Sequence, residues 1–253
     1  MSLVRERPDV RSASCVHVDV WSIDLDNWQG PVLAECLAVL DSAETTRAAR
    51  FTRQVDAIRF VRAHAATRLL LAHATGGHAA KLRWDRSANG KPSRVLGVEW
   101  NLSHSEGMAQ LAVVPAGTGA AGVGIDVQTT ALRFDASRFA RRYLSPGEQR
   151  MLGERPSRGA LAMAIARKEA AVKAVGLRLL DALDTDTSSS STVVMPGTEE
   201  NAARQVRIKA LESQRGGAVA VAVAVASRAA NPANQFTTTT RDWLLAGGGE
   251  RVV

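Results

Sequence analysis

The 253-residue sequence has little of several residue types that define other classes of protein. It contains only two cysteines, Cys15 and Cys36, and neither has the spacing to further cysteines or histidines that a zinc site needs. No run approaches the roughly 18 to 20 consecutive apolar residues of a membrane span. The first 15 residues carry charge and no apolar stretch, which is not typical of a secretory signal. We therefore expect reduced cysteines, a cytoplasmic protein and no membrane partner.

Aromatic residues are also scarce, at 4% of the chain, whereas 45% of the residues are apolar and 23% are charged, the balance of a globular protein. The formal net charge is +7, and most of the basic excess is arginine, which favours an anionic ligand or partner. No zinc knuckle, no glycine and aromatic RNA-binding pattern and no basic-region helix accompanies this charge. We expect no nucleic-acid partner, and a basic nucleic-acid-binding protein stays as the weaker alternative.

Hydrophobic patterning predicts a first α+β half at residues 1–118. Near residues 15–25 apolar and polar side chains nearly alternate, as in a half-buried strand. A helical region should follow from about residue 30 to His73, and Gly76 should end its last helix. The residues up to Val114 predict strands joined by turns, one of them at Asn89-Gly90.

The second half, which we place at residues 119–228, repeats this order of a strand, helices and further strands. The strand "GVGIDVQ" at 122–128 precedes helices between residues 136 and 176, and the alternating run "GGAVAVAVAVAS" at 216–227 ends the half. We expect residues 229–253 to be a peripheral tail. The predicted fold class is α+β, with two similar halves and an active site in the cleft between them.

The strand 122–128 carries two polar residues where a buried strand would have apolar ones. If Ile125 and Val127 face the core, Asp126 and Gln128 project together from the opposite face. A carboxylate and an amide oxygen side by side can bind a hard cation such as Mg²⁺. For so short a motif, an exposed strand end with two ordinary polar residues remains the alternative.

A second motif is "ARKEAAVKAVG", on the last predicted helix. Glu169 and Lys173 are four residues apart and share one helix face, with Lys168 about a quarter turn away. A surface ion pair would explain the two residues equally well. The neighbouring alanines and Gly176 are small, however, and they would allow close approach to a ligand or to another backbone.

The third motif is "WNLSHSEG", with "NGKPSR" before it. Lys91 on a tight turn and His104 after a strand are both suited to meeting phosphate. A serine-histidine nucleophile is disfavoured, because neighbouring side chains on a strand point to opposite faces and Ser103 and Ser105 should not reach His104. A purely structural role for His104 remains the alternative.

Together, "NGKPSR…WNLSHSEG", "GVGIDVQ", "RRYLSPGEQRML" and "ARKEAAVKAVGLRL" resemble, in sequence and in order, the signatures of the surfactin-type 4'-phosphopantetheinyl transferases. Those signatures are G-K-P, N-x-S-H-S, G-[IV]-D-[IV]-E, F-x-S-x-x-E and W-x-x-K-E-A-x-x-K. The resemblance runs from about Arg47 to Leu179. It implies two α+β halves in one chain that works as a monomer. It also implies an Mg²⁺-dependent transfer of the 4'-phosphopantetheine arm of coenzyme A to a serine of an apo acyl or peptidyl carrier protein, with release of 3',5'-ADP.

The resemblance also implies roles for individual residues. Asp126 and Glu169, with Gln128 beside them, would hold Mg²⁺, Glu169 would act as the general base, and Lys173 would stabilise phosphate charge. Coenzyme A would be bound at the adenine, at the phosphates and at the 3'-phosphate by residues matching the family's motifs: Lys91, Pro92, Ser103, His104, Arg47, Arg59, Lys168 and Lys173. The basic balance suits polyanionic coenzyme A and an acidic carrier.

Three departures from the family pattern affect this hypothesis. Gln128 stands where many members have glutamate, so one negative charge is missing at the metal site. Ala166 replaces the tryptophan and Tyr143-Leu144 the usual aromatic pair, both of which suggest changes in packing. Glu148 matches a family acid, yet capping of a helix after Ser145 would explain it equally well. Because of Gln128, a degraded homologue that binds coenzyme A or a carrier without transfer is the alternative function.

Overall fold

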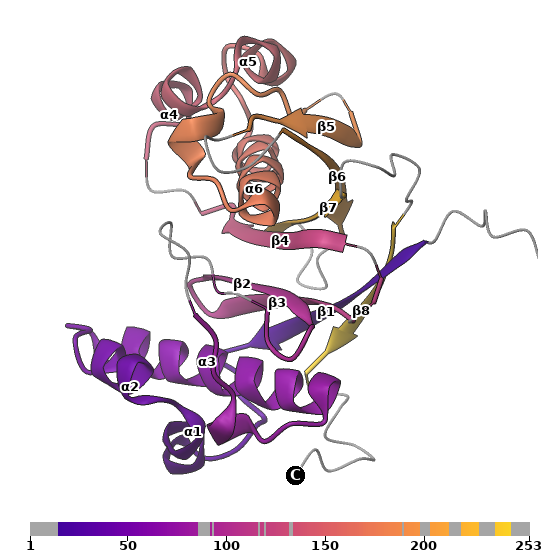
Figure 1. Ribbon diagram of the computed structural model, residues 1–253. Helices are drawn as coiled ribbons and strands as arrows, with labels where there is room; N and C mark the ends of the chain where they lie inside the picture. Colours follow the sequence, from indigo (N-terminus) through magenta and orange to yellow (C-terminus); the bar gives the residue numbers. More distant parts are fainter. Residues whose placement is uncertain are drawn as a thin grey trace, which may run out of the picture.

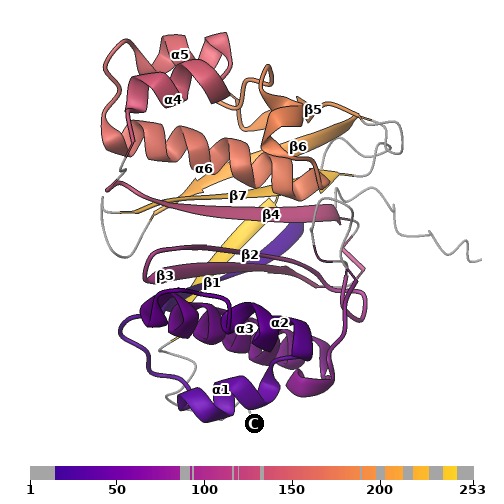
Figure 2. The ribbon, with the colours of Figure 1, turned by 90° about the vertical axis from the view of Figure 1, so that its left-hand side faces the viewer.

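The computed structural model describes residues 15–85, 92, 94–115, 117–118, 120–131, 134–188, 190–197, 203–212, 219–227 and 236–243. These residues form four layers, in which two β-sheets stack on one another and each sheet carries helices on its outer face (Figures 1 and 2). The α+β class expected from the sequence is confirmed. Among the described residues, no helix combines the length and the apolar character needed to cross a membrane.

The first sheet has the strand order β2-β3-β1-β8. Its strands are β1 (Val16–Asp24), β2 (Glu99–Ser105), β3 (Met108–Val114) and β8 (Phe236–Asp242). Three helices and a 3₁₀ turn cover it: α1 (Leu33–Val39), α2 (Ser42–Ala48), α3 (Gln54–Thr75) and η1 (Ala79–Lys81). The predicted end of α3 is confirmed, because Gly76 caps the helix in the left-handed conformation with a φ of 67°.

Strand β8 was not expected, since it lies in the region predicted to be a peripheral tail. It pairs in parallel with β1, from Val16 opposite Phe236 to Ser22 opposite Asp242. The segment therefore joins the sheet of the first half, although it follows the whole second half in the chain. Its run of four threonines lacks the alternation of apolar and polar residues that identifies a half-buried strand, and this is why the sequence pattern missed it.

The second sheet has the order β4-β7-β6-β5. Its strands are β4 (Ala120–Thr129), β5 (Thr192–Met195), β6 (Arg204–Leu211) and β7 (Val219–Ser227). Its outer face carries α4 (Ala136–Tyr143), α5 (Pro146–Leu152), α6 (Arg158–Val175) and η2 (Leu179–Ala182). In both halves the first strand is followed by three helices and pairs antiparallel with the final antiparallel strand, β1 with β3 and β4 with β7.

The two halves also repeat one internal anchor. In each, the second helix begins with a capping box whose glutamate is buried, Glu44 in α2 and Glu148 in α5. Each glutamate forms an ion pair with a buried cation of the long helix, Glu44 with Arg68 at 2.6 Å and Glu148 with Lys168 at 2.7 Å. Each cation lies eight residues before the glycine that ends its helix. The similarity of the halves is thus visible in contacts, although the sequence shows no clear repeat.

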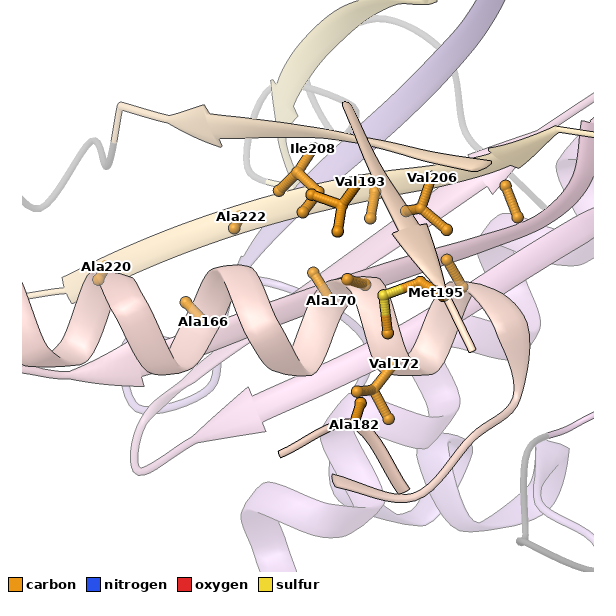
Figure 3. Packing of buried hydrophobic residues seen from close by; sticks show 14 of the residues in the cluster. Ala166, Ala170, Val172, Ala182, Val193, Met195, Val206, Ile208, Ala220 and Ala222 are labelled. Atoms are coloured by element: carbon orange, nitrogen blue, oxygen red, sulfur yellow. The ribbon is translucent and has the colours of Figure 1, made fainter. Parts of the chain in front are cut away.

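The hydrophobic core differs from layer to layer. Between the two sheets it consists mostly of valine from β1, β4 and β7. Between α6 and the second sheet it consists mainly of alanine, including Ala166 and Ala170 of α6 and Ala222 of β7 (Figure 3). Because the side chain of alanine is a single methyl group, this layer allows α6 to lie very close to the sheet.

Candidate active site

Helix α6 lies very close to the sheet at Gly124 of β4. A Cβ atom on Gly124 would lie 2.1 Å from the carbonyl oxygen of Ala170 and 2.5 Å from the amide nitrogen of Ala174. Only glycine fits at this position, since neither neighbour is a flexible side chain that could move away. The contact brings the helix turn that carries Glu169 and Lys173 next to the strand residue two positions after Gly124, which is Asp126.

The carboxylate of Asp126 is the centre of a polar cluster and is only 2% exposed. Lys173 donates to its Oδ1 atom at 2.5 Å, and the Ser103 hydroxyl donates to the same atom at 2.8 Å. The amide of Gln128 donates to Oδ2 at 2.7 Å. The structure therefore brings together Asp126, Gln128 and Lys173, as the sequence predicted, and adds Ser103 from the other half.

Glu169 is half-buried near this cluster. Burial raises the pKa of its carboxyl group, Lys173 lowers it and the nearby Asp126 raises it further. Among the described residues, Glu169 makes no hydrogen bond and no ion pair, in contrast to Asp126. A partly desolvated carboxylate without a partner, next to a second carboxylate, is a group that a cation would stabilise.

This donor set fits Mg²⁺. Within the described part of the chain, no three His, Cys, Asp or Glu side chains gather at one point, so the acidic ligands would be Asp126 and Glu169 alone. Gln128 would add an amide oxygen if its side chain turned over. Hard oxygen donors from few protein ligands are what Mg²⁺ takes when it also binds phosphates and keeps several waters.

Cationic and imidazole groups adjoin the carboxylates on the side of the first half. The ring of His104 reaches solvent, yet the protein around it removes enough water to lower its pKa, and His64, Lys173 and Arg47 lower it further. Arg47 is exposed on α2, and its guanidinium lies 5.3 Å from the centre of the Phe60 ring. His64, Lys173 and Arg47 thus each lie within electrostatic reach of His104, a grouping that suits an anion with several charges.

Other residues predicted to bind coenzyme A are placed differently. Arg59 makes two hydrogen bonds to Asp26, of 2.8 and 2.7 Å, so its charge is already balanced by a carboxylate. Pro92 is half-buried, and Lys91 lies outside the described residues. The roles of these three residues at coenzyme A stay predictions.

Lys168 is fully buried, and within the described part of the chain its ammonium is surrounded by acceptors of the protein itself. Its ammonium donates to Glu148 and to the carbonyl oxygens of Leu183 and Tyr143, at 2.7, 2.9 and 3.4 Å. Glu148 also takes the amide and hydroxyl of Thr187, at 3.0 and 2.6 Å. The capping role suggested for Glu148 is present, and Lys168 has the contacts of an internal anchor rather than of a residue open to a cofactor.

Reasoning from the sequence missed one member of the site, His64, and one contact of a predicted member, the bond from Ser103 to Asp126. His64 lies on α3, within the predicted helical region, and its proximity to His104 depends on how α3 packs against the sheet. The bond from Ser103 to Asp126 joins residues 23 positions apart in different sheets. The signal that was available is the alternation of polar residues at Asn101, Ser103 and Ser105 in the "NLSHS" motif.

Comparison with known families addresses the same region. The sequence model of the 4'-phosphopantetheinyl transferase superfamily matches residues 122–224, from β4 into β7. Residues 122–224 belong to this superfamily. The match includes Asp126, Gln128, Glu169 and Lys173, and Ser103 and His104 lie before it. No curated protein matches the chain. The superfamily resemblance seen in the sequence motifs is therefore confirmed over the second half, and it identifies a transferase of the phosphopantetheinyl kind.

Proposed function

We propose that the protein transfers the 4'-phosphopantetheine arm of coenzyme A to a serine of an apo acyl or peptidyl carrier protein, with Mg²⁺, and releases 3',5'-ADP. The observation that carries this proposal is the juxtaposition of Asp126 and Glu169 with the group formed by Lys173, His104, His64 and Arg47. An acid pair that favours a metal, next to several groups that favour an anion, is the arrangement that a metal-bound pyrophosphate requires.

Each residue then has a defined task. Glu169 accepts the proton of the carrier serine, and the serine oxygen forms a bond to the β-phosphorus of coenzyme A while the bond from that phosphorus to the bridging oxygen breaks. Lys173 stabilises negative charge on the phosphates, and His104 and Arg47 orient coenzyme A. Mg²⁺, when bound by Asp126 and Glu169, supplies positive charge to the pyrophosphate.

The carrier would approach the second half, where α4 presents a basic surface. Arg138, Arg141 and Arg142 are exposed on this helix, and Phe134 just before it is 46% exposed. An acidic carrier would complement these charges. We also propose a monomer, because the first half of the same chain brings Ser103 and His104 to the acidic residues of the second half. A location in the cytoplasm is part of the same proposal.

One observation favours a second candidate, a homologue that binds coenzyme A or a carrier without transferring anything. The side-chain amide of Gln128 donates to Oδ2 of Asp126 at 2.7 Å, so it occupies an oxygen of the carboxylate that the metal would need. An ionised glutamate has no hydrogen to donate and would repel Asp126. If this hydrogen bond persisted in the complex, Asp126 would be a weaker metal ligand.

The two candidates are separated by incubating the protein with an apo carrier, coenzyme A and Mg²⁺ and measuring the carrier by intact-protein mass spectrometry. We expect the carrier to gain the mass of one phosphopantetheinyl group, and the gain to disappear when Mg²⁺ is chelated. Binding of coenzyme A without any gain on fatty-acid, polyketide or peptide carriers would favour the second candidate instead.

A further inference from the structure

Side chains of β2 bind the free edge of β4 and thereby join the two sheets. Among the described strands, β4 is the edge of its sheet, so alternate amide groups along it have no strand of that sheet to bind. Asn101 Oδ1 accepts from the amide of Ile125 at 2.9 Å. Ser103 Oγ and Ser105 Oγ accept in the same way from the amides of Val127 and Thr129, each at 3.4 Å. Every second residue of "NLSHS" is thus used at the boundary between the halves.

Ser103 differs from its neighbours in this row because it also contacts the acid cluster. Its hydroxyl hydrogen goes to Asp126 Oδ1 at 2.8 Å, and its oxygen accepts from Lys173 at 3.3 Å in addition to the amide of Val127. A hydroxyl has one hydrogen to donate and two lone pairs to accept with, so Ser103 is fully committed within the protein. Both partners of this bond are buried, Ser103 at 7% and Asp126 at 2% exposure.

These contacts give Ser103 a task that differs from phosphate binding. Because Ser103 and Lys173 both donate to Oδ1, they define the orientation of the Asp126 carboxylate from two sides, one in each half. Without the hydroxyl, Oδ1 would be left with Lys173 alone, and the carboxylate would be free to turn toward the ammonium. Hydrogen bonds to buried charged groups are among the stronger ones, and their loss leaves the charge incompletely satisfied.

We propose that Ser103 is a positioning residue, which holds the Asp126 carboxylate and the Lys173 ammonium in the arrangement that binds the metal. The inference rests on the proposed function only in taking Asp126 as a ligand of Mg²⁺. It assigns the serine of the first half to the metal site of the second half, and it leaves His104, on the opposite face of β2, as the member of the motif that meets the anion.

Ser103→Ala is the direct test, and Ser105→Ala is its matched control. Both serines lie on the same strand and face, and both accept one amide of β4 at 3.4 Å, but only Ser103 touches Asp126. The measurement is the Mg²⁺ dissociation constant, obtained by isothermal titration calorimetry of full-length protein mixed with coenzyme A but no carrier, so that no transfer takes place. We expect Ser103→Ala to weaken Mg²⁺ binding by about tenfold or more and Ser105→Ala to leave it within about twofold.

A second pair of variants covers the case in which Ser103→Ala does not fold. Ser103→Thr and Ser103→Val have the same shape and differ in the hydroxyl, so only the threonine variant should bind Mg²⁺ with nearly the wild-type constant. Equal Mg²⁺ affinity in the alanine variants, or in the threonine and valine variants, would overturn the positioning role while leaving the proposed function intact. Absence of Mg²⁺ binding by the wild-type protein would overturn both.

Discussion

The two halves of the molecule have the same scaffold but bring their long helices to the sheet in different ways. Between α3 and the first sheet lie large side chains, among them Leu70, Leu71, Trp100 and Leu111. Between α6 and the second sheet lie mostly alanines, and Gly124 lets the backbones touch. Large side chains hold α3 away from its strands, whereas α6 is close enough for side chains of the helix and of β4 to share one site.

The same comparison separates residues of the scaffold from residues of the chemistry. The pairs Glu44–Arg68 and Glu148–Lys168 occur in both halves and connect a helix cap to the long helix. The residue after the buried cation is Leu69 in the first half and Glu169 in the second. What the halves share therefore stabilises the fold, and what only the second half has, an acid beside Asp126, is what the proposed reaction uses.

If Lys168 belongs to the scaffold, its loss should resemble the loss of its counterpart in the first half. Lys168→Ala would leave Glu148 buried without its cation, and Arg68→Ala would leave the buried Glu44 with His64 as its remaining ion-pair partner among the described residues. We expect each variant to lose about 3–5 kcal/mol of unfolding free energy, the largest effect among these variants. Urea unfolding followed by circular dichroism measures both. A Lys168→Ala protein of normal stability that binds coenzyme A poorly would return Lys168 to the binding site.

The close approach of α6 can be changed by a single methyl group. Gly124→Ala should force α6 away from β4, with a loss of about 1–3 kcal/mol and a larger fractional loss of transfer, because Glu169 moves with the helix. Gly159→Ala, near the start of the same helix, is the control, since a Cβ there would meet nothing within 4 Å. Thermal unfolding and transfer rates should show Gly159→Ala at or slightly above wild-type stability. Full activity in Gly124→Ala would show that the helix need not be so close.

The arginines of the first half should differ in how much they contribute to the binding of coenzyme A. Arg47 is exposed and lies in the group with His104, whereas the charge of Arg59 is balanced by Asp26. We expect Arg47→Ala to raise the KM for coenzyme A by about tenfold, equivalent to about 1.4 kcal/mol, and Arg59→Ala to raise it less. Steady-state kinetics at fixed carrier concentration would decide this, and the reverse order would mean that Arg59 leaves Asp26 when coenzyme A binds.

A smaller effect concerns stability without metal. Burial and the nearby Asp126 raise the pKa of Glu169, so the folded protein binds this proton more tightly than the unfolded chain does. The contribution of Glu169 to the free energy of unfolding therefore falls as the pH rises above the ordinary pKa of a glutamate. At neutral pH in a chelating buffer, Glu169→Gln should unfold at a slightly higher temperature than wild type. The difference should vanish at a pH below the ordinary glutamate pKa. A lower unfolding temperature for Glu169→Gln at neutral pH would contradict the unfavourable burial of this carboxylate.

The sequence predicted those parts of the fold that local periodicity determines. The alternation around Val16, Val18 and Val20 identified β1, and the four-residue spacing of Glu169 and Lys173 put them on one helix face. It did not predict how distant segments meet. The Arg59–Asp26 pair and the Ser103–Asp126 bond join residues 33 and 23 positions apart, and no periodicity reports such contacts. Lys168 was assigned to the cofactor because a motif gives the residue type but not the side of the helix that becomes buried.

The most direct test of this account is to measure phosphopantetheine transfer to an apo carrier by Glu169→Gln and Leu69→Gln, which change equivalent positions in the two halves to the same residue. The account predicts that Leu69→Gln keeps most of the wild-type rate, whereas Glu169→Gln loses about 10²–10³-fold or more while coenzyme A still binds. Near-normal transfer by Glu169→Gln, or an equal loss in both variants, would contradict the claim that the second half alone supplies the carboxylate that accepts the proton of the carrier serine.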